Sequence, residues 1–187
     1  MTSRSSILST ADTRRPAVAA AALREFAQGG YHGTTVASVA QEAKISAAYV
    51  FKLFPRKESL FAAALEACFD AVVQALDEGT EDIGSTDPCA ILDAMGGAYA
   101  ALIRDRTLLM LQVHAQSVAD IPEIGEALRA GLARVTEFAK ERSAGSDEEV
   151  QRFMAYGQLC HLIVTARIEE SSASWAQLLS RGIRHPD

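Results

Sequence analysis

Alanine, the best helix former, recurs along this chain and occupies 34 of its 187 positions. Alanine loses no side-chain entropy when a helix forms, which is why it favours helices above all other residues. Aromatic residues make up only 6% of the chain, and no segment alternates apolar and polar residues as a half-buried strand does. The sequence therefore predicts an all-α protein.

Proline and glycine divide the apolar pattern into separate helices. Pro16, Pro88 and Pro122 lie where periodic stretches begin, and there a missing N–H costs no helical hydrogen bond. Gly29-Gly30 is typical of a helix end, and residues 79–87 have the composition of a loop. The predicted helices cover residues 13–28, 35–43, 46–53, 57–78, 88–104, 106–119, 122–142, 147–169 and 172–183.

The charge of the chain is unevenly distributed. Residues 1–60 carry eight Lys/Arg and four Asp/Glu, whereas the remaining residues carry ten Lys/Arg and twenty Asp/Glu. The net charge of −6 therefore hides a basic N-terminal third on an acidic body. Because an acidic surface repels a polyanion, any contact with nucleic acid is expected at the N-terminal end.

Residues 29–58 have the pattern of two short helices joined by a tight turn. Either Thr34 or Thr35 can cap the helix at 35–43, whose apolar residues repeat on one face. Ser46 can cap the helix at 46–53, in which Val50 and Phe54 share an inward face. This arrangement predicts a helix-turn-helix.

The outer face of the second short helix is the surface that can enter a major groove. Ala47 and Ala48 are small enough for a close approach to the bases, while Tyr49 and Lys52 share a face and supply hydrogen-bond donors. Lys57, at the start of the next helix, adds a cation for a phosphate group.

Residues 34–65, TTVASVAQEAKISAAYVFKLFPRKESLFAAAL, resemble the DNA-binding domain of the TetR family, the tetracycline-repressor-like bacterial regulators. The family pattern is matched by Thr34-Thr35-Val36, Val39-Ala40, Ala43 with Ile45-Ser46, Val50-Phe51 with Phe54, and Lys57-Glu58 with Leu60.

Three positions depart from that pattern. Lys44 stands where the turn usually has glycine, so the chain either tolerates a strained turn or adopts another one. Phe51 replaces a tyrosine whose hydroxyl commonly meets a phosphate, and Leu53 replaces a histidine. Tyr49 is a candidate source of the displaced hydroxyl.

The resemblance implies a homodimeric regulator built from two parts. Residues 1–11 are expected to be a flexible arm, residues 12–58 the helix-turn-helix domain, and residues 59–187 a helical domain for ligand binding and dimerisation. The expected DNA-binding residues are Thr34, Thr35, Ser46, Ala47, Ala48, Tyr49, Phe51, Lys52 and Lys57.

The resemblance also implies a small-molecule pocket and a dimer interface in the C-terminal part. The candidate ligand contacts are Met95, Tyr99, His114, Met154, Gln158 and His161, each of which could equally be a core residue. The expected dimer interface consists of Leu159, Ile163, Trp175, Leu178, Leu179 and Ile183, and the alternative is a monomeric core.

Other functional classes find little support. Cys68, Cys89 and Cys160 are far apart and form no CxxC pair, so neither a disulfide framework nor a metal site is expected. No catalytic or nucleotide-binding motif is present, and no enzyme activity or cofactor is expected. No apolar run approaches the length of a membrane span, and we expect a cytoplasmic protein without a membrane partner.

The sequence thus predicts a DNA-binding transcriptional regulator that binds an inverted-repeat operator as a homodimer. A repressor released by a small-molecule effector is the favoured form. The alternative is a helical module that binds a small molecule or a protein without binding DNA.

Overall fold

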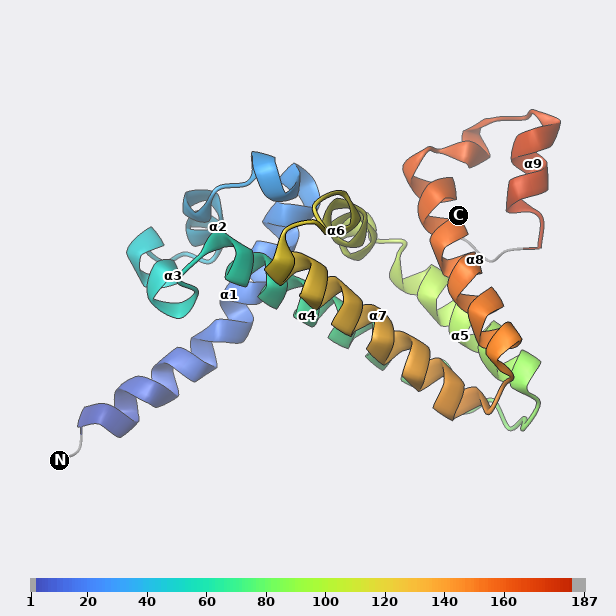
Figure 1. Cartoon of the computed structure of the whole chain (residues 1–187), viewed down its shortest axis with the longest axis horizontal. Coiled ribbons are helices and arrows are strands. Elements are labelled where there is room, and N and C mark those ends of the chain that lie inside the picture. Colours follow the sequence, from blue (N-terminus) through green and yellow to red (C-terminus); the bar gives the residue numbers. More distant parts are fainter. Residues whose placement is uncertain (1–2, 183–187) are drawn as a thin grey trace. The chain divides into compact units, whose positions relative to one another are not determined.

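The computed structural model describes residues 3–182, and within this range every regular element is a helix (Figure 1). The elements are α1 (Ser3–Gly33), α2 (Val36–Glu42), α3 (Ala47–Leu53), α4 (Lys57–Glu78), α5 (Pro88–Leu102), α6 (Arg106–Ser117), α7 (Pro122–Ser143), α8 (Asp147–Thr165), the 3-10 turn η1 (Ile168–Glu170) and α9 (Ser174–Ser180). The prediction of an all-α fold is confirmed.

Two ends differ from the sequence prediction. Residues 3–11, expected to form an arm, belong to α1, and Pro16, expected near the start of a helix, lies inside it. The helix expected at 147–169 ends at Thr165, because Arg167 adopts a left-handed conformation with φ 50. Ile168 follows and is buried, so the chain turns back to place an apolar side chain in the core.

A glycine ends the regular part of α1, as predicted. Gly30 has φ 64 and ψ −176, a combination that side chains with a Cβ atom rarely adopt. The ring of His114 on α6 packs against this glycine, since a Cβ added to Gly30 would lie 3.2 Å from His114 Nδ1. The positive φ therefore favours glycine, and a side chain here would also require the His114 ring to shift by a few tenths of an ångström.

The described residues form two compact units. The first contains the chain up to Cys68 together with Met110–Gly131, and the second contains Phe69–Leu109 and the chain from Leu132 onward. Helices α4, α6 and α7 contribute residues to both units. The sequence predicts a boundary after residue 58, between a DNA-binding part and a ligand-binding part. The two compact units do not test this boundary, which stays a prediction.

Aromatic packing between α1 and α4 forms the core of the first unit. The ring centroids of Phe26 and Phe61 are 4.6 Å apart, and both side chains are fully buried. Val39 of α2 and Val50 of α3 are also fully buried, so both short helices are anchored to the same unit by apolar side chains.

Helix α4 is long and apolar enough, by length and composition, to cross a membrane. Its apolar residues are largely buried within the protein, and the set includes Leu60, Phe61, Ala64, Leu65, Cys68, Phe69, Val72 and Leu76. A core helix of this kind passes the same test of composition, so α4 is explained as a core element.

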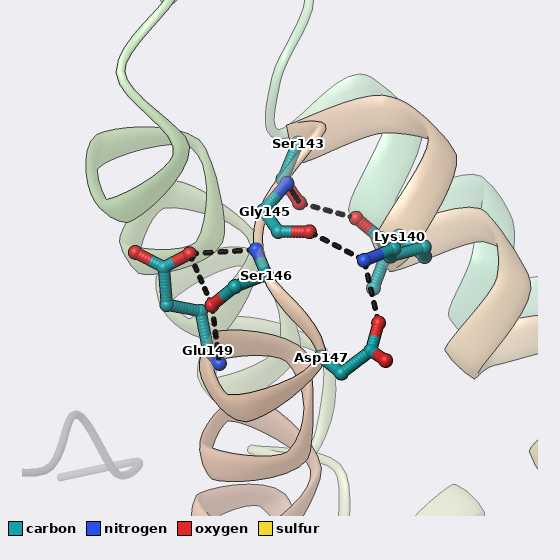
Figure 2. Close-up of polar contacts among 7 residues, drawn as sticks. Lys140, Ser143, Gly145, Ser146, Asp147 and Glu149 are labelled. Carbon is teal, nitrogen blue, oxygen red and sulfur yellow. Dashed lines mark hydrogen bonds and ion pairs between the residues drawn. The ribbon is translucent and has the colours of Figure 1, made fainter.

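The junction of α7 and α8 shows how the second unit is stabilised locally (Figure 2). Ser146 caps α8, because its Oγ accepts a hydrogen bond from the Glu149 N–H at 3.3 Å and the Glu149 carboxylate accepts one from the Ser146 N–H at 2.7 Å. Lys140 Nζ donates to Gly145 O at 2.8 Å and to Asp147 Oδ1 at 2.6 Å. These contacts satisfy backbone groups that the two helix ends leave open.

Candidate functional site

Hydroxyl caps define the start of α2 and of α3. Thr35 Oγ1 accepts a hydrogen bond from the Ser38 N–H at 3.0 Å, and Ser38 Oγ accepts one from the Thr35 N–H at 3.3 Å. Ser46 Oγ accepts from the Tyr49 N–H at 3.2 Å. Of the two predicted caps for α2, the structure therefore selects Thr35, and the predicted cap of α3 is confirmed. Each cap is worth about 1 kcal/mol of helix stability.

Thr34 has a different role from the one expected. Its side chain is buried, and its Oγ1 donates a hydrogen bond to Glu25 O at 2.9 Å. This bond ties the segment between the helices to α1, and it leaves the hydroxyl unavailable to DNA. The prediction of a DNA contact by the Thr34 side chain is corrected accordingly.

The turn between α2 and α3 is left-handed at a residue other than glycine. Lys44 has φ 54, and its N–H bonds Gln41 O at 3.1 Å while the Ile45 N–H bonds Ala40 O at 2.9 Å. A side chain in this conformation costs about 1–2 kcal/mol. Of the two alternatives, the chain tolerates the strained turn.

Helix α3 has a buried face and an exposed face. Val50 and Leu53 are buried, as is Phe54 just beyond the helix. Ala48 and Lys52 are exposed and lie four residues apart, which places them one above the other on the opposite face. Half-buried Tyr49 and exposed Phe51 flank them, while half-buried Ala47 lies toward the core side of the helix.

The ammonium group of Lys57, at the start of α4, faces the ring of Tyr31. This contact was not predicted from the sequence. The Lys57 Nζ is 4.6 Å from the ring centroid of Tyr31, and burial lowers the pKa of this lysine from its ordinary value. The Tyr31 hydroxyl donates a hydrogen bond to Glu58 Oε1 at 2.5 Å. Burial and the bond to Glu58 raise the pKa of Tyr31 to about 12, and the same bond lowers the pKa of Glu58.

The six predicted ligand contacts do not form one set. Met95 and Tyr99 belong to α5, and Met154, Gln158 and His161 belong to α8, which packs against α5 in the second unit. Gln158 is exposed, whereas Met95 and His161 are buried. His114 lies in the first unit against Gly30, so the prediction that it shares a cluster with the others is not supported.

Half-buried Tyr99 and buried His161 form a polar pair. The Tyr99 hydroxyl lies 2.5 Å from His161 Nε2, and His161 is only 5% exposed. Its Nδ1 is buried and has no hydrogen-bond partner within the described part of the chain. Burial lowers the pKa of His161 to about 4, so the ring is neutral near pH 7.

The predicted interface residues divide into buried and exposed groups. Ile163 is fully buried in a cluster with Ile168 and Ala176, so its prediction as an interface residue is corrected. Leu159 and Leu179 pack against this cluster. Trp175 and Leu178 remain 56% and 69% exposed, and Ile183 lies outside the described residues.

Two further apolar side chains of the same region are exposed. Tyr156 and Leu162, both on α8, are 49% and 51% exposed. Each lies in a periodic apolar stretch, and periodicity alone does not distinguish the wall of a core from a solvent-facing side.

The N-terminal region matches a family model described as bacterial regulatory proteins of the tetR family, over residues 18–64. The matched segment contains the second part of α1, both short helices and the start of α4. Over these residues the chain is similar to the tetR family.

One relative of this chain is the HTH-type transcriptional regulator HbdR from Aromatoleum sp. (strain CIB), which is 31% identical over 101 residues. The match covers 52% of the present chain and 43% of HbdR, so the chain spans less than half of that relative's length.

Solved structures share the fold over most of the chain. A TetR-family transcriptional regulator from Agrobacterium tumefaciens has a TM-score of 0.68 and 17% identity, with 91% of this chain and 95% of that chain covered. The regulator FadR from Bacillus subtilis, solved in complex with stearoyl-CoA, has a TM-score of 0.65 and 17% identity, with 89% and 98% covered. At this identity the likeness establishes the fold alone.

The buried His161 predicts a loss of stability in mild acid. Between pH 6.5 and about 4 the unfolded chain binds a proton at His161 that the folded chain does not. The free energy of unfolding therefore falls as the pH falls through this window, by up to about 3 kcal/mol from this group. Urea unfolding at several pH values should show a shallower pH dependence for His161→Gln than for the wild type. Equal dependence in both proteins would contradict the assignment.

Proposed function

We propose that this chain is a TetR-family transcriptional regulator that binds double-stranded operator DNA as a homodimer and is released by a small-molecule effector. The observation that carries DNA binding is the exposed face of α3, where Ala48 and Lys52 project from a helix that Ser46 caps and Val50 anchors. The HTH-type regulators related to this region support the proposal. Action on DNA implies a cytoplasmic protein.

The chemistry of the exposed α3 face suits a major groove. Ala48 adds little bulk, so the helix backbone is able to approach the base edges. Lys52, one turn later, supplies a cation that is able to donate to guanine O6 and N7. Phe51 and Tyr49 flank this pair, and Phe51 offers an apolar surface to a thymine methyl group.

Loss of the central cation should weaken specific binding most. We expect Lys52→Ala to reduce affinity for a duplex selected from a random library by about 1–3 kcal/mol. Arg152→Ala on α8 is the control, because it removes an exposed cation from the acidic second unit. Fluorescence anisotropy at fixed salt measures both variants.

Equal affinities of the two variants would exclude α3 as the reading helix. Absence of salt-dependent duplex binding by the wild type would instead favour a helical module without DNA binding.

Exposed apolar side chains support a homodimer formed through α8 and α9. Tyr156, Leu162, Trp175 and Leu178 are each about half exposed or more, and surfaces of this kind commonly mark protein interfaces. A second copy of the chain would bury them. Two copies would also present two α3 helices, whose spacing must be about 34–36 Å to reach successive major grooves.

A charge on this surface should dissociate the dimer without unfolding the chain. Leu178→Asp places a carboxylate at a 69% exposed position, so the monomer has little reason to lose stability. Neighbouring Gln177→Asp is the control, since it adds the same charge at an exposed polar position. Sedimentation should show monomers for the first variant and dimers for the second. Dimers for both would contradict this interface.

We infer that the effector contacts the Tyr99–His161 pair. A phenol O–H is the better donor, so we assign Tyr99 as the donor to His161 Nε2, which leaves the proton of the neutral ring on Nδ1. A buried N–H without a partner is costly, and a ligand oxygen would satisfy it. The effector is therefore expected to carry a carbonyl or carboxylate oxygen. The neighbour FadR, solved with stearoyl-CoA, supports a small-molecule effector in general.

Release of DNA requires the effector and the operator to oppose each other. Helix α4 begins at Lys57 and contributes residues to both units. A change at the effector site in the second unit could therefore reach Lys57 along this helix. A carbonyl compound found by thermal shift should bind about 5–150-fold more weakly when operator DNA is present, because coupling is reciprocal. His161→Phe should lose this ligand and keep duplex affinity. Equal ligand affinity with and without operator would exclude that compound as an inducer.

A further inference from the structure

The start of α4 holds a cluster that the proposed function does not by itself explain. It consists of Tyr31, Lys57 and Glu58, which one ring contact and one hydrogen bond connect. The two interactions differ in kind, because the ring faces the ammonium group of Lys57 while the hydroxyl reaches the neighbouring carboxylate. We call these three residues the Tyr31 cluster.

The ring of Tyr31 is held by aromatic neighbours. It meets Phe61 edge-on, with centroids 5.8 Å apart and planes at 77°, and Phe61 in turn packs on Phe26 at 4.6 Å. The ring of His32 also meets Tyr31 edge-on, with centroids 5.2 Å apart. Because Phe26 and Phe61 are fully buried, the Tyr31 ring is fixed to the core of the first unit.

The hydroxyl of Tyr31 fixes Glu58. A carboxylate next to Lys57 would otherwise be free to pair with its ammonium group or to repel a phosphate at the same helix end. The 2.5 Å hydrogen bond from Tyr31 holds this carboxylate and lowers its pKa. The Glu58 carboxylate therefore stays charged and bonded to the Tyr31 hydroxyl. The other cation of this turn, Arg56, is paired with Glu123 at 2.8 Å.

Lys57 is the cation of the Tyr31 cluster, and the carboxylate next to it is already bonded to Tyr31. Its ammonium group lies 4.6 Å from the Tyr31 centroid, a position in which the ring face attracts the charge. The side chain is half-buried, which restricts its rotamers before any ligand arrives.

We propose that Tyr31 is a positioning residue, which presents the Lys57 ammonium group to a DNA phosphate through its ring and holds Glu58 aside through its hydroxyl. This inference rests on the proposed DNA-binding function. Tyr31 lies outside the exposed face of α3. Its role would therefore affect affinity for all DNA sequences alike, because phosphate contacts carry no sequence information.

The test is a double-mutant cycle on binding of a labelled duplex of arbitrary sequence over a series of KCl concentrations. Lys57→Met should lower affinity and reduce the salt slope by about 0.9 for each phosphate that the lysine no longer neutralises. Tyr31→Phe keeps the ring and removes only the hydroxyl, and it should weaken binding several-fold in the wild-type background. In the Lys57→Met background its effect should be clearly smaller, because the side chain that it positions is gone and only repulsion by the released Glu58 carboxylate remains.

A purely structural role for Tyr31 gives a different result. Tyr31→Phe would then lower the melting temperature and weaken DNA binding equally in both backgrounds, and such additivity would overturn the proposal. Tyr31→Leu should behave as Tyr31→Phe does but with a larger loss of affinity, because it removes the ring as well. Failure of the wild type to bind the duplex with a salt dependence would overturn the proposed function itself, a result distinct from an additive cycle.

Discussion

The backbone at Gly30 turns with φ 64 and ψ −176, and the DNA-binding region is arranged around this turn. Just beyond it, Tyr31 reaches Glu58 and Lys57 on α4, Thr34 returns a hydrogen bond to Glu25 on α1, and Thr35 caps α2. A Cβ atom at Gly30 would be strained and would press on His114. Glycine at this position thus permits the turn that precedes Tyr31, Thr34 and Thr35.

The two polar clusters of this protein, around Lys57 and around His161, differ in exposure and in charge. In the first unit, Lys57 stays partly exposed and its neighbours are paired, which leaves a charge available to an anion. In the second unit, His161 is buried and neutral, and its Nδ1 has no partner among the residues described. The first arrangement suits a permanent, sequence-independent contact with phosphate, and the second suits a ligand that must supply the missing partner.

Local interactions explain why so much of the helix-turn-helix could be predicted. The caps at Thr35 and Ser46 join groups three residues apart, and the apolar stripe of α3 repeats within two turns, so both are visible in a short window of sequence. The contacts that sequence reasoning missed are distant in the chain. Tyr31 and Glu58 are 27 positions apart, and Tyr99 and His161 are 62 positions apart.

The order of residues was enough to predict the helical class, most helix limits and the segment that resembles the TetR DNA-binding domain, because propensity, capping and periodicity act over a few residues. Which members of an apolar or polar stripe face inward depended instead on how the helices pack. Packing buried Thr34 and Ile163, left Leu178 exposed and placed His114 in a different unit from His161. The reason is physical, because the burial of a side chain depends on which distant helix covers it. The residue pattern within one helix does not identify that other helix.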